Sequence, residues 1–240
     1  MSLSALALAL LLTATPADSV SVAPPADDFP VVLGSFTTTL LGSLPERTHN
    51  LRLAAAALDG TVLRPGEELS FNLVVGPRTA ARGYGPAPVI LRERRDVQVG
   101  GGVCQVASTL FDAALLAGLT VVERHRHSSP VDYVAPGEDA TIAWGAKDLR
   151  LRNDLAQDVR VRVEVLGATL AARIEGGKEG DADFDLQTVE RTSPAPDDVA
   201  GLPGRDVELY RVRLRDGEEE SRELIHRDHY PPSRSRTGGR

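Results

Sequence analysis

The run Gly100-Gly101-Gly102-Val103-Cys104-Gln105 decides how this chain folds. Residues 97–99 before it are β-branched at two of three positions and predict a strand. Residues 103–117 carry apolar side chains at helical spacing, and Gly118 closes that helix. Because glycine adopts backbone angles that other residues avoid, the three glycines predict a sharp passage from the strand into the helix.

The remaining pattern predicts an α+β fold, in which two helices pack on a mainly antiparallel sheet and a C-terminal β-hairpin extension follows. The other helix is expected over 48–58, where apolar residues recur at helical spacing. Alternating apolar residues over 69–75 predict a strand that ends at Gly76. Further strands are expected at residues 31–40, 89–91, 121–122, 141–144, 159–165 and 169–174.

Composition divides the chain into six segments. Residues 1–17 hold an apolar stretch followed by small residues and predict a signal peptide. We therefore expect an exported protein, cell-wall associated or periplasmic, with no transmembrane segment after cleavage. The other segments are a linker over 18–30, the main domain over 31–175, a second linker over 176–204, a β-hairpin extension over 205–232 that docks on the main domain, and a disordered tail over 233–240.

Charge and cysteine content exclude several classes of protein. The 240 residues include 27 Lys and Arg against 34 Asp and Glu, a formal net charge of −7. Binding along nucleic acid needs a clustered excess of cations, so no nucleic-acid partner is expected. The single cysteine, Cys104, excludes an intrachain disulfide framework and a thiolate-rich zinc site. No motif implies a cofactor, and the oligomeric state stays open.

Cys104 is the candidate nucleophile. A thiol in the first turn of a helix lies near unsatisfied backbone N–H groups and the positive end of the helix dipole, and both favour the thiolate. The same N–H groups can stabilise an oxyanion. A small buried hydrophobic role is the structural alternative for this cysteine. A phosphate-binding loop is a further alternative for the glycines, but the lysine of a P-loop is missing.

A thiolate nucleophile also needs a base and a group that orients the base. His125 and His127 lie two residues apart, so they share a face in an extended backbone. Asp139 is the candidate acceptor that would fix the imidazole tautomer. The same histidine spacing suits a metal, but one cysteine and few nearby acids disfavour a closed zinc site, and we expect no metal.

Sequence blocks in order along residues 33–165 resemble the VanW family, which is named after an accessory product of vancomycin-resistance clusters. The glycine run through Gln105 is the most specific block. The C-terminal hairpin is also similar to the β-rich tail of many members. The other blocks are Gly34-Ser35-Phe36, Arg47-Thr48-His49-Asn50, residues 63–67, Ser70-Phe71-Asn72, residues 75–78, Gly83-Tyr84, His127-Ser128, Tyr133, Pro136-Gly137 and Asp139-Ala140.

The resemblance implies a bacterial envelope protein whose partners are peptidoglycan stem peptides. Some VanW-domain proteins are understood to be L,D-transpeptidases, in which the cysteine of the glycine-rich block joins two stem peptides between meso-diaminopimelate residues. On this basis Cys104, His127 and Asp139 would form the catalytic set, and Arg47 and Arg78 would pair with substrate carboxylates. Substrate-binding positions are expected at Arg47, Asn50, Arg78, Tyr84, Gly101, Gly102, Gln105, His125 and Tyr133.

Two alternatives stay open for the sequence. A cysteine amidase or carboxypeptidase would form the same acyl-enzyme but let water resolve it. A noncatalytic stem-peptide-binding module would hold a carboxylate at the glycine loop and the helix N-terminus without reacting.

Overall fold

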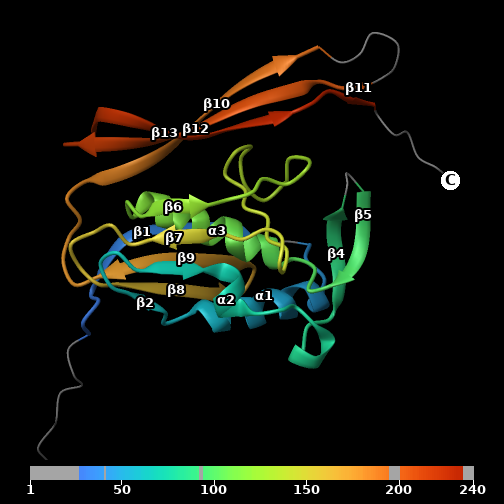
Figure 1. Ribbon diagram of the computed structural model, residues 1–240, viewed down its shortest axis with the longest axis horizontal. Coiled ribbons are helices and arrows are strands. Elements are labelled where there is room, and N and C mark those ends of the chain that lie inside the picture. Colours follow the sequence, from blue (N-terminus) through green and yellow to red (C-terminus); the bar gives the residue numbers. More distant parts are fainter. Residues whose placement is uncertain (1–26, 41, 92–93, 195–200, 235–240) are drawn as a thin grey trace, which may run out of the picture.

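The main domain is built on a four-stranded antiparallel sheet (Figure 1). The computed structural model describes residues 27–40, 42–91, 94–194 and 201–234. The sheet has the order β1-β9-β8-β2, and most of its strand β8 alternates buried and half-buried side chains, as expected for a sheet with one face in the core. Its strands are β1 (Val31–Thr39), β2 (Val62–Leu63), β8 (Val159–Leu166) and β9 (Thr169–Gly176).

Two longer helices pack on this sheet and on each other. Helix α1 (Pro45–Leu58) contacts β8, and helix α3 (Val103–Leu116) contacts β1 and β9. Shorter elements surround the helices. They are β3 (Glu68–Ser70), β7 (Arg150–Arg152) and β6 (Thr120–Glu123) in one small sheet, the hairpin β4 (Pro86–Leu91) and β5 (Arg94–Val99), the short helix α2 (Phe71–Val75), and a 3₁₀ turn at Ala80–Arg82.

A second antiparallel sheet, which we call the C-terminal sheet, lies across the top of the main domain in Figure 1. It consists of β10 (Asp183–Ser193), β12 (Gly204–Arg215) and β13 (Glu218–Tyr230), with β12 at its centre. The short strands β11 (Gly201–Leu202) and β14 (Ser233–Arg234) pair beside it. Arg211 of β12 donates a hydrogen bond to the carbonyl of Leu119 at 2.8 Å, which ties this sheet to the end of α3.

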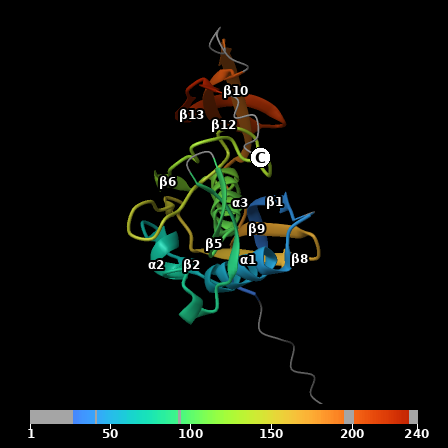
Figure 2. The ribbon, with the colours of Figure 1, turned by 90° about the vertical axis from the view of Figure 1, so that its right-hand side faces the viewer.

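Helix α3 lies between the two layers, as Figure 2 shows. One side packs on the sheet of the main domain and the other lies under the C-terminal sheet, so every residue from Val103 to Leu115 except Cys104 is buried. A helix that is buried on all sides is rich in apolar residues, and α3 adds to these the buried polar residues Gln105, Ser108, Thr109 and Asp112. The sequence predicts one buried face on this helix, whereas both faces are buried. The prediction was too narrow because the local pattern does not reveal that the C-terminal sheet covers the second face.

Most predicted elements are confirmed. The strand at 31–40, the strands at 89–91 and 97–99, the β8–β9 hairpin and the passage from strand to helix through the glycine run all occur, although β5 already begins at Arg94. The α+β prediction is consistent with this architecture. Helix α1 begins three residues earlier than predicted, because Pro45 occupies the first helical turn, where a proline costs no hydrogen bond.

The strand predicted over 69–75 is wrong beyond Ser70. The Ser70 hydroxyl accepts a hydrogen bond from the backbone N–H of Leu73 at 3.1 Å and so caps helix α2. This helix buries Phe71 and Val75, which lie four residues apart on one face, and leaves Leu73 exposed. The apolar residues alternate here although they belong to two elements, because β3 ends at Ser70 and α2 begins at Phe71.

The linker predicted over 176–204 is also wrong, since β10 and β11 lie within it. Strand β10 pairs with β12 from Asp183 to Ser193, so the expected hairpin is part of a three-stranded sheet. The predicted strand at 141–144 is reduced to one bridge between Ala143 and Lys147. Residues 233–234, expected in a disordered tail, form β14. The predicted signal peptide, most of the 18–30 linker, and residues 235–240 lie outside the described residues.

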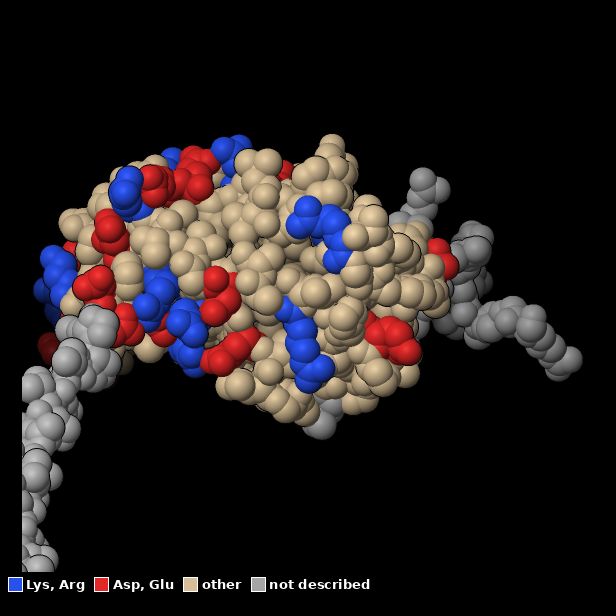
Figure 3. All heavy atoms as spheres, turned by 90° about the horizontal axis from the view of Figure 1, so that it is seen from below, with Lys and Arg blue, Asp and Glu red and all other residues tan. Residues whose placement is uncertain are grey.

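The surface view of Figure 3 shows acidic and basic side chains intermingled toward one end of the molecule, with a largely uncharged surface over the rest of that face. Ion pairs such as Arg160–Glu175 at 2.6 Å and Arg173–Glu164 at 2.6 Å connect neighbouring strands on the β8–β9 hairpin. In the part of the chain that the structure describes, no helix is long and apolar enough to cross a membrane.

Gly34 offers a test of the packing between β1 and α3. A Cβ atom at Gly34 would lie 2.7 Å from the carbonyl oxygen of Ala113 and would overlap with backbone of Ala117. Because backbone cannot move aside as a side chain can, we expect Gly34→Ala to lower the free energy of unfolding by about 1–3 kcal/mol in urea denaturation. Gly85→Ala is the matched control, since the added methyl group meets nothing within 4 Å. Equal stability of the two variants would contradict this account.

Candidate active site

The glycine run places Cys104 in the first turn of α3. Gly102, with φ of 100°, is the N-cap residue, and Gly100 also has a positive φ of 84°. Cys104 is half-buried, and its Sγ lies 3.5 Å from Oγ1 of Thr141 and 3.7 Å from the carbonyl oxygen of Ile142. Within the described residues, the backbone N–H groups of Gly102 and Cys104 have no hydrogen-bond acceptor. The thiol therefore lies beside free donors at a helix N-terminus.

Each glycine of the run makes room for a different neighbour. A Cβ at Gly100 would lie 2.6 Å from the Cβ of Arg78, and one at Gly102 would lie 2.7 Å from the Cγ of Arg47. At Gly101 it would overlap with the backbone of β4. The run thus lets two arginines and a strand approach the start of α3 together.

His127 and Asp139 form a buried pair beside the thiol. The Oδ2 atom of Asp139 accepts hydrogen bonds from Nδ1–H of His127 at 2.6 Å and from its backbone N–H at 2.7 Å. This pairing fixes the imidazole tautomer and leaves Nε2 free of the aspartate, and His127 lies near enough to Cys104 to lower the pKa of its thiol. The structure therefore brings together the three residues that the sequence singled out as nucleophile, base and orienting acid.

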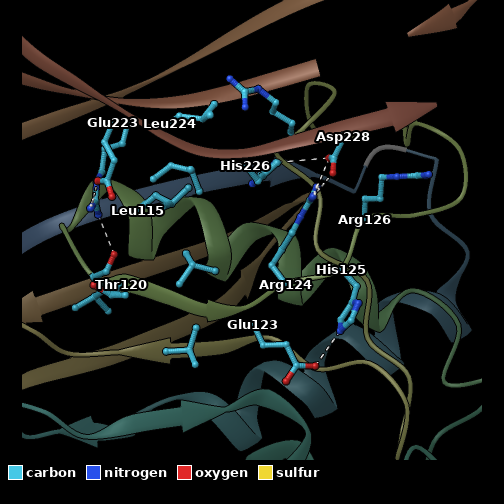
Figure 4. A pocket seen from close by; sticks show the side chains of 16 residues that line it. Leu115, Thr120, Glu123, Arg124, His125, Arg126, Glu223, Leu224, His226 and Asp228 are labelled. Atoms are coloured by element: carbon cyan, nitrogen blue, oxygen red, sulfur yellow. Dashed lines mark hydrogen bonds and ion pairs between the residues drawn. The ribbon is translucent and has the colours of Figure 1, made fainter. Parts of the chain in front are cut away.

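A buried arginine anchors Asp139 from the other side. Arg124, which follows β6, donates to Oδ1 of Asp139 at 3.0 Å and to its carbonyl at 2.6 Å. Its Nη1 contacts both carboxylate oxygens of Asp228 in β13 at 2.7 Å, as the dashed lines in Figure 4 show. The Tyr230 hydroxyl donates to Oδ1 of Asp139 at 3.4 Å. The C-terminal sheet thus contacts the acid of the candidate triad.

These contacts set the charges of the three groups. Burial raises the pKa of the Cys104 thiol, but the hydrogen bond and charge of His127 outweigh burial and lower it to about 7. Burial lowers the pKa of His127, whereas its hydrogen bonds with Asp139 and Cys104 raise it to about 9. Burial raises the pKa of Asp139, and His127 and Arg124 hold it below its ordinary value. Between about pH 7 and 9 the site holds a thiolate beside an imidazolium.

Arg47 and Arg78 approach the thiol from two elements. Arg47 of α1 donates to the Ser43 hydroxyl at 2.9 Å and to Oε1 of Gln105 at 2.7 Å. Arg78 donates from Nη1 to Oδ1 of Asn72 at 2.7 Å. Burial lowers the pKa of both guanidinium groups, and the negative charge of Cys104 is among the influences that oppose this. Arginine nevertheless stays charged, so both cations face the thiolate.

The other predicted substrate-binding residues divide into two groups. Asn50 and Gln105 are buried, and their side-chain amides make hydrogen bonds within the fold. Asn50 donates to the carbonyls of Gly85 at 2.9 Å and Gly101 at 3.0 Å, and Gln105 accepts from Arg47. Tyr84 is also buried. Asn50 and Gln105 therefore hold the surroundings of the glycine run through bonds within the fold, and Tyr84 belongs to the hydrophobic core. Tyr133 is half-buried, and its hydroxyl lies 3.5 Å from Oγ of Ser108 on α3.

His125 lies apart from the triad. Its Nε2 pairs with Oε1 of Glu123 at 2.9 Å, and both side chains line the cavity of about 470 Å³ between β6 and β13 in Figure 4. The choice of base between the two histidines therefore falls on His127. Among the described residues, no three His, Cys, Asp or Glu side chains gather in a way that could hold a metal ion.

Sequence reasoning missed Arg124, Asp228, Tyr230 and Thr141. Arg124 lies within the histidine-rich segment, where the local sequence predicts an exposed cation. Its partner Asp228 is 104 residues away in the chain. No local pattern marks such a pair, because the contact exists only once the C-terminal sheet has docked.

Asp228 offers a test of this anchor. Removal of one partner of a buried ion pair leaves an uncompensated charge and costs about 3–5 kcal/mol. Because Arg124 still pairs with Asp139 in the Asp228→Ala variant, we expect a loss at the lower end of this range. The free energy of unfolding in urea denaturation should fall by about 3 kcal/mol. The control Asp206→Ala breaks the exposed pair with His229 in the same sheet and should leave stability nearly unchanged. Similar losses in both variants would show that Arg124 does not hold the layers together.

Comparison with known proteins places this geometry in a family. A family model described as VanW like protein matches residues 46–175. The uncharacterized protein YoaR of Bacillus subtilis (strain 168) is 44% identical over 138 residues, which cover 58% of this chain and 46% of that protein. The Vancomycin B-type resistance protein VanW of Enterococcus faecalis (strain ATCC 700802 / V583) is 34% identical over 113 residues, which cover 45% of this chain and 41% of that protein.

The matches span less than half the length of either relative. No solved structure matches the chain significantly. Cys104, His127 and Asp139 lie inside the stretch that the family model matches, whereas Asp228 and Tyr230 lie beyond it. More than half of the chain is covered by that model, and the chain belongs to the VanW-like family.

Proposed function

We propose that this protein is a cysteine acyltransferase acting on peptidoglycan stem peptides, an L,D-transpeptidase that forms cross-links between two stems. One observation carries the proposal: the thiol of Cys104 lies in the first turn of a helix, and its pKa is lowered by a histidine that a buried aspartate orients. Nucleophile, base and orienting acid in this order are the requirements of covalent acyl transfer. The family membership and the resistance protein among the relatives support a role at the bacterial cell wall.

The first half of the reaction forms a thioester. The Cys104 thiolate attacks the carbonyl carbon of the third residue of a tetrapeptide stem, and a carbon–sulfur bond forms as the carbonyl oxygen becomes an oxyanion. The free N–H groups of Gly102 and Cys104 are the donors available to that oxyanion. Collapse of the intermediate breaks the peptide bond, and the His127 imidazolium gives its proton to the departing amine of D-alanine.

The second half restores the thiolate. The amine of a second stem attacks the thioester, and neutral His127 accepts a proton from that amine. The carbon–sulfur bond breaks, a new amide joins the stems, and Cys104 leaves as the thiolate. His127 returns to the imidazolium form, so the site ends each cycle in its starting charge state.

Arg47 and Arg78 are the groups that would bind the carboxylates of the stem. Arg78 packs against Gly100 and Arg47 against Gly102, and both sense the charge of Cys104, so two positive charges lie near the reacting carbonyl. Arg47 is held by Gln105 and Ser43, and Arg78 by Asn72, so neither guanidinium must be ordered when the substrate binds. Because stem peptides lie outside the cytoplasmic membrane, the proposal also requires export, for which residues 1–17 are the candidate signal.

The proposed acyl-enzyme can be detected directly. Incubation with a tetrapeptide muropeptide should raise the intact mass of the protein by the donor less its terminal D-alanine, with the adduct on Cys104. Since Cys104 is the only cysteine, Cys104→Ser is the control for thioester formation. Cross-linked dimers among the products support transfer, whereas shortened monomers alone would assign a hydrolase. Absence of the adduct from the wild-type protein would overturn the proposal.

The charge state of the site predicts its pH dependence. Alkylation of Cys104 by iodoacetamide should rise through about pH 7, the pKa of its thiol. Acyl transfer should fall below that pH, as the thiolate gains a proton, and above about pH 9, as His127 loses the proton it donates. In Asp139→Asn the pKa of His127 falls, the imidazolium no longer supports the thiolate, and the alkylation midpoint should rise toward the ordinary value of about 8.5.

His125→Asn is the matched control for this profile, because His125 pairs with Glu123 and does not contact the triad. Its midpoint should equal that of the wild-type protein. A midpoint near the ordinary thiol value in the wild-type protein, or no change in Asp139→Asn, would show that the thiol is not activated by the His127–Asp139 pair.

A further inference from the structure

A second cavity, of about 440 Å³, is lined by residues close in the chain to those that contact the thiol and has no role in the chemistry described above. It is bounded by the start of α2 and by residues 144–148. Trp144 is 52% exposed and Leu73 is 80% exposed, although both side chains are large and apolar. A cavity of this size is in the range of small-molecule sites, about 300–1,000 Å³.

Two links connect the cavity with the surroundings of the nucleophile, one along the chain and one through Arg78. Thr141 and Ile142 contact Sγ of Cys104, and Trp144 follows Ile142 by two residues. The guanidinium of Arg78, whose pKa responds to the charge of Cys104, lies 6.0 Å from the centre of the Trp144 ring. Arg78 also bonds Asn72, which lines the cavity. A ligand that reacts with the thiol can therefore extend into this space.

The chemistry of the lining selects a neutral ring. The carboxylate of Asp148 already accepts hydrogen bonds from Ser70 at 2.5 Å and from the backbone of Asn72 at 2.8 Å. Glu123 is engaged by His125. The acids are thus occupied and offer little to an incoming ammonium group, while the exposed indole and Leu73 offer apolar surface. The Trp144 indole N–H and the exposed Lys147 ammonium can donate hydrogen bonds to hydroxyl or amide oxygens.

We propose that this cavity binds a pyranose ring of the glycan strand that carries the stem peptide, with one face of the sugar against Trp144. A pyranose ring has a face of C–H groups suited to an aromatic surface and a rim of hydroxyls suited to donors. The inference rests on the proposed function, which puts the third stem residue at Cys104. Three extended residues span at most about 11 Å, and Trp144 is two positions after Ile142, at most about 7 Å along the chain, so the stem is long enough for its sugar end to reach the cavity.

The single tryptophan makes the test specific to this cavity. In the full chain with Cys104→Ala, which prevents reaction, fluorescence is titrated with a disaccharide tetrapeptide and with the same tetrapeptide without sugar. We expect the disaccharide form to change Trp144 emission and to bind about tenfold more tightly. Equal affinities for the two ligands would overturn the inference.

Calorimetry of variants of the Cys104→Ala protein separates a lost contact between the sugar and Trp144 from a general loss of structure. Trp144→Ala should weaken binding of the disaccharide tetrapeptide about tenfold and leave binding of the bare tetrapeptide unchanged, and Trp144→Phe should restore most of the affinity. Leu166→Ala, which truncates an exposed apolar residue on the β8–β9 hairpin, is the control and should bind as the parent does. Equal weakening of both ligands by Trp144→Ala would also overturn the inference.

The two proposals fail in distinguishable ways. Loss of the Cys104 adduct with the sugar preference intact would remove the transpeptidase and keep the glycan site. An adduct formed equally well with and without sugar, together with equal affinities, would keep the enzyme and remove the glycan site.

Discussion

The buried carboxylate of Asp139 is the constraint on which the rest of the site depends. A carboxylate held away from water is costly unless donors surround it, and here they come from three parts of the chain: His127, Arg124 and Tyr230. The first belongs to the loop between β6 and β7, the second directly follows β6, and the third ends β13. Because each donor must be in place for the charge to be stable, the loop, the main domain and the C-terminal sheet cannot adopt independent positions.

The same constraint explains why Arg124 has two acids. A lone arginine between Asp139 and the apolar face of α3 would concentrate its charge on Asp139 and weaken the support that this carboxylate gives to His127. Asp228 takes a share of that charge through two contacts at 2.7 Å. The imidazole that Asp139 orients has a pKa of about 9, above the pKa of about 7 of the thiol. The C-terminal sheet therefore contacts the arginine that holds Asp139 and also packs against α3.

Sequence reasoning found what is local or chemically conspicuous. The glycine run, the position of Cys104 and the pairing of His127 with Asp139 follow from residue types and short spacings. It failed at Ser70, where one alternating pattern runs across the end of a strand and the start of a helix. It also failed for the ion pair of Arg124 and Asp228, whose partners are distant in the sequence. It also took Asn50 and Gln105 for ligand contacts, since a polar residue in a characteristic motif looks the same whether it faces a substrate or holds a loop from behind.

The segment from Thr141 to Asp148 links the nucleophile to the cavity beside it. Its first residue contacts the thiol, and its last is bonded to Ser70 and Asn72 at the start of α2. Asn72 also accepts from Arg78 and donates to the carbonyl of Lys147 at 2.8 Å. A movement of α2 would thus shift Arg78 and the Trp144 turn together. Because the cations, the aromatic surface and the thiol share these bonds, their spacing is fixed before any substrate binds, which lowers the entropy that binding must overcome.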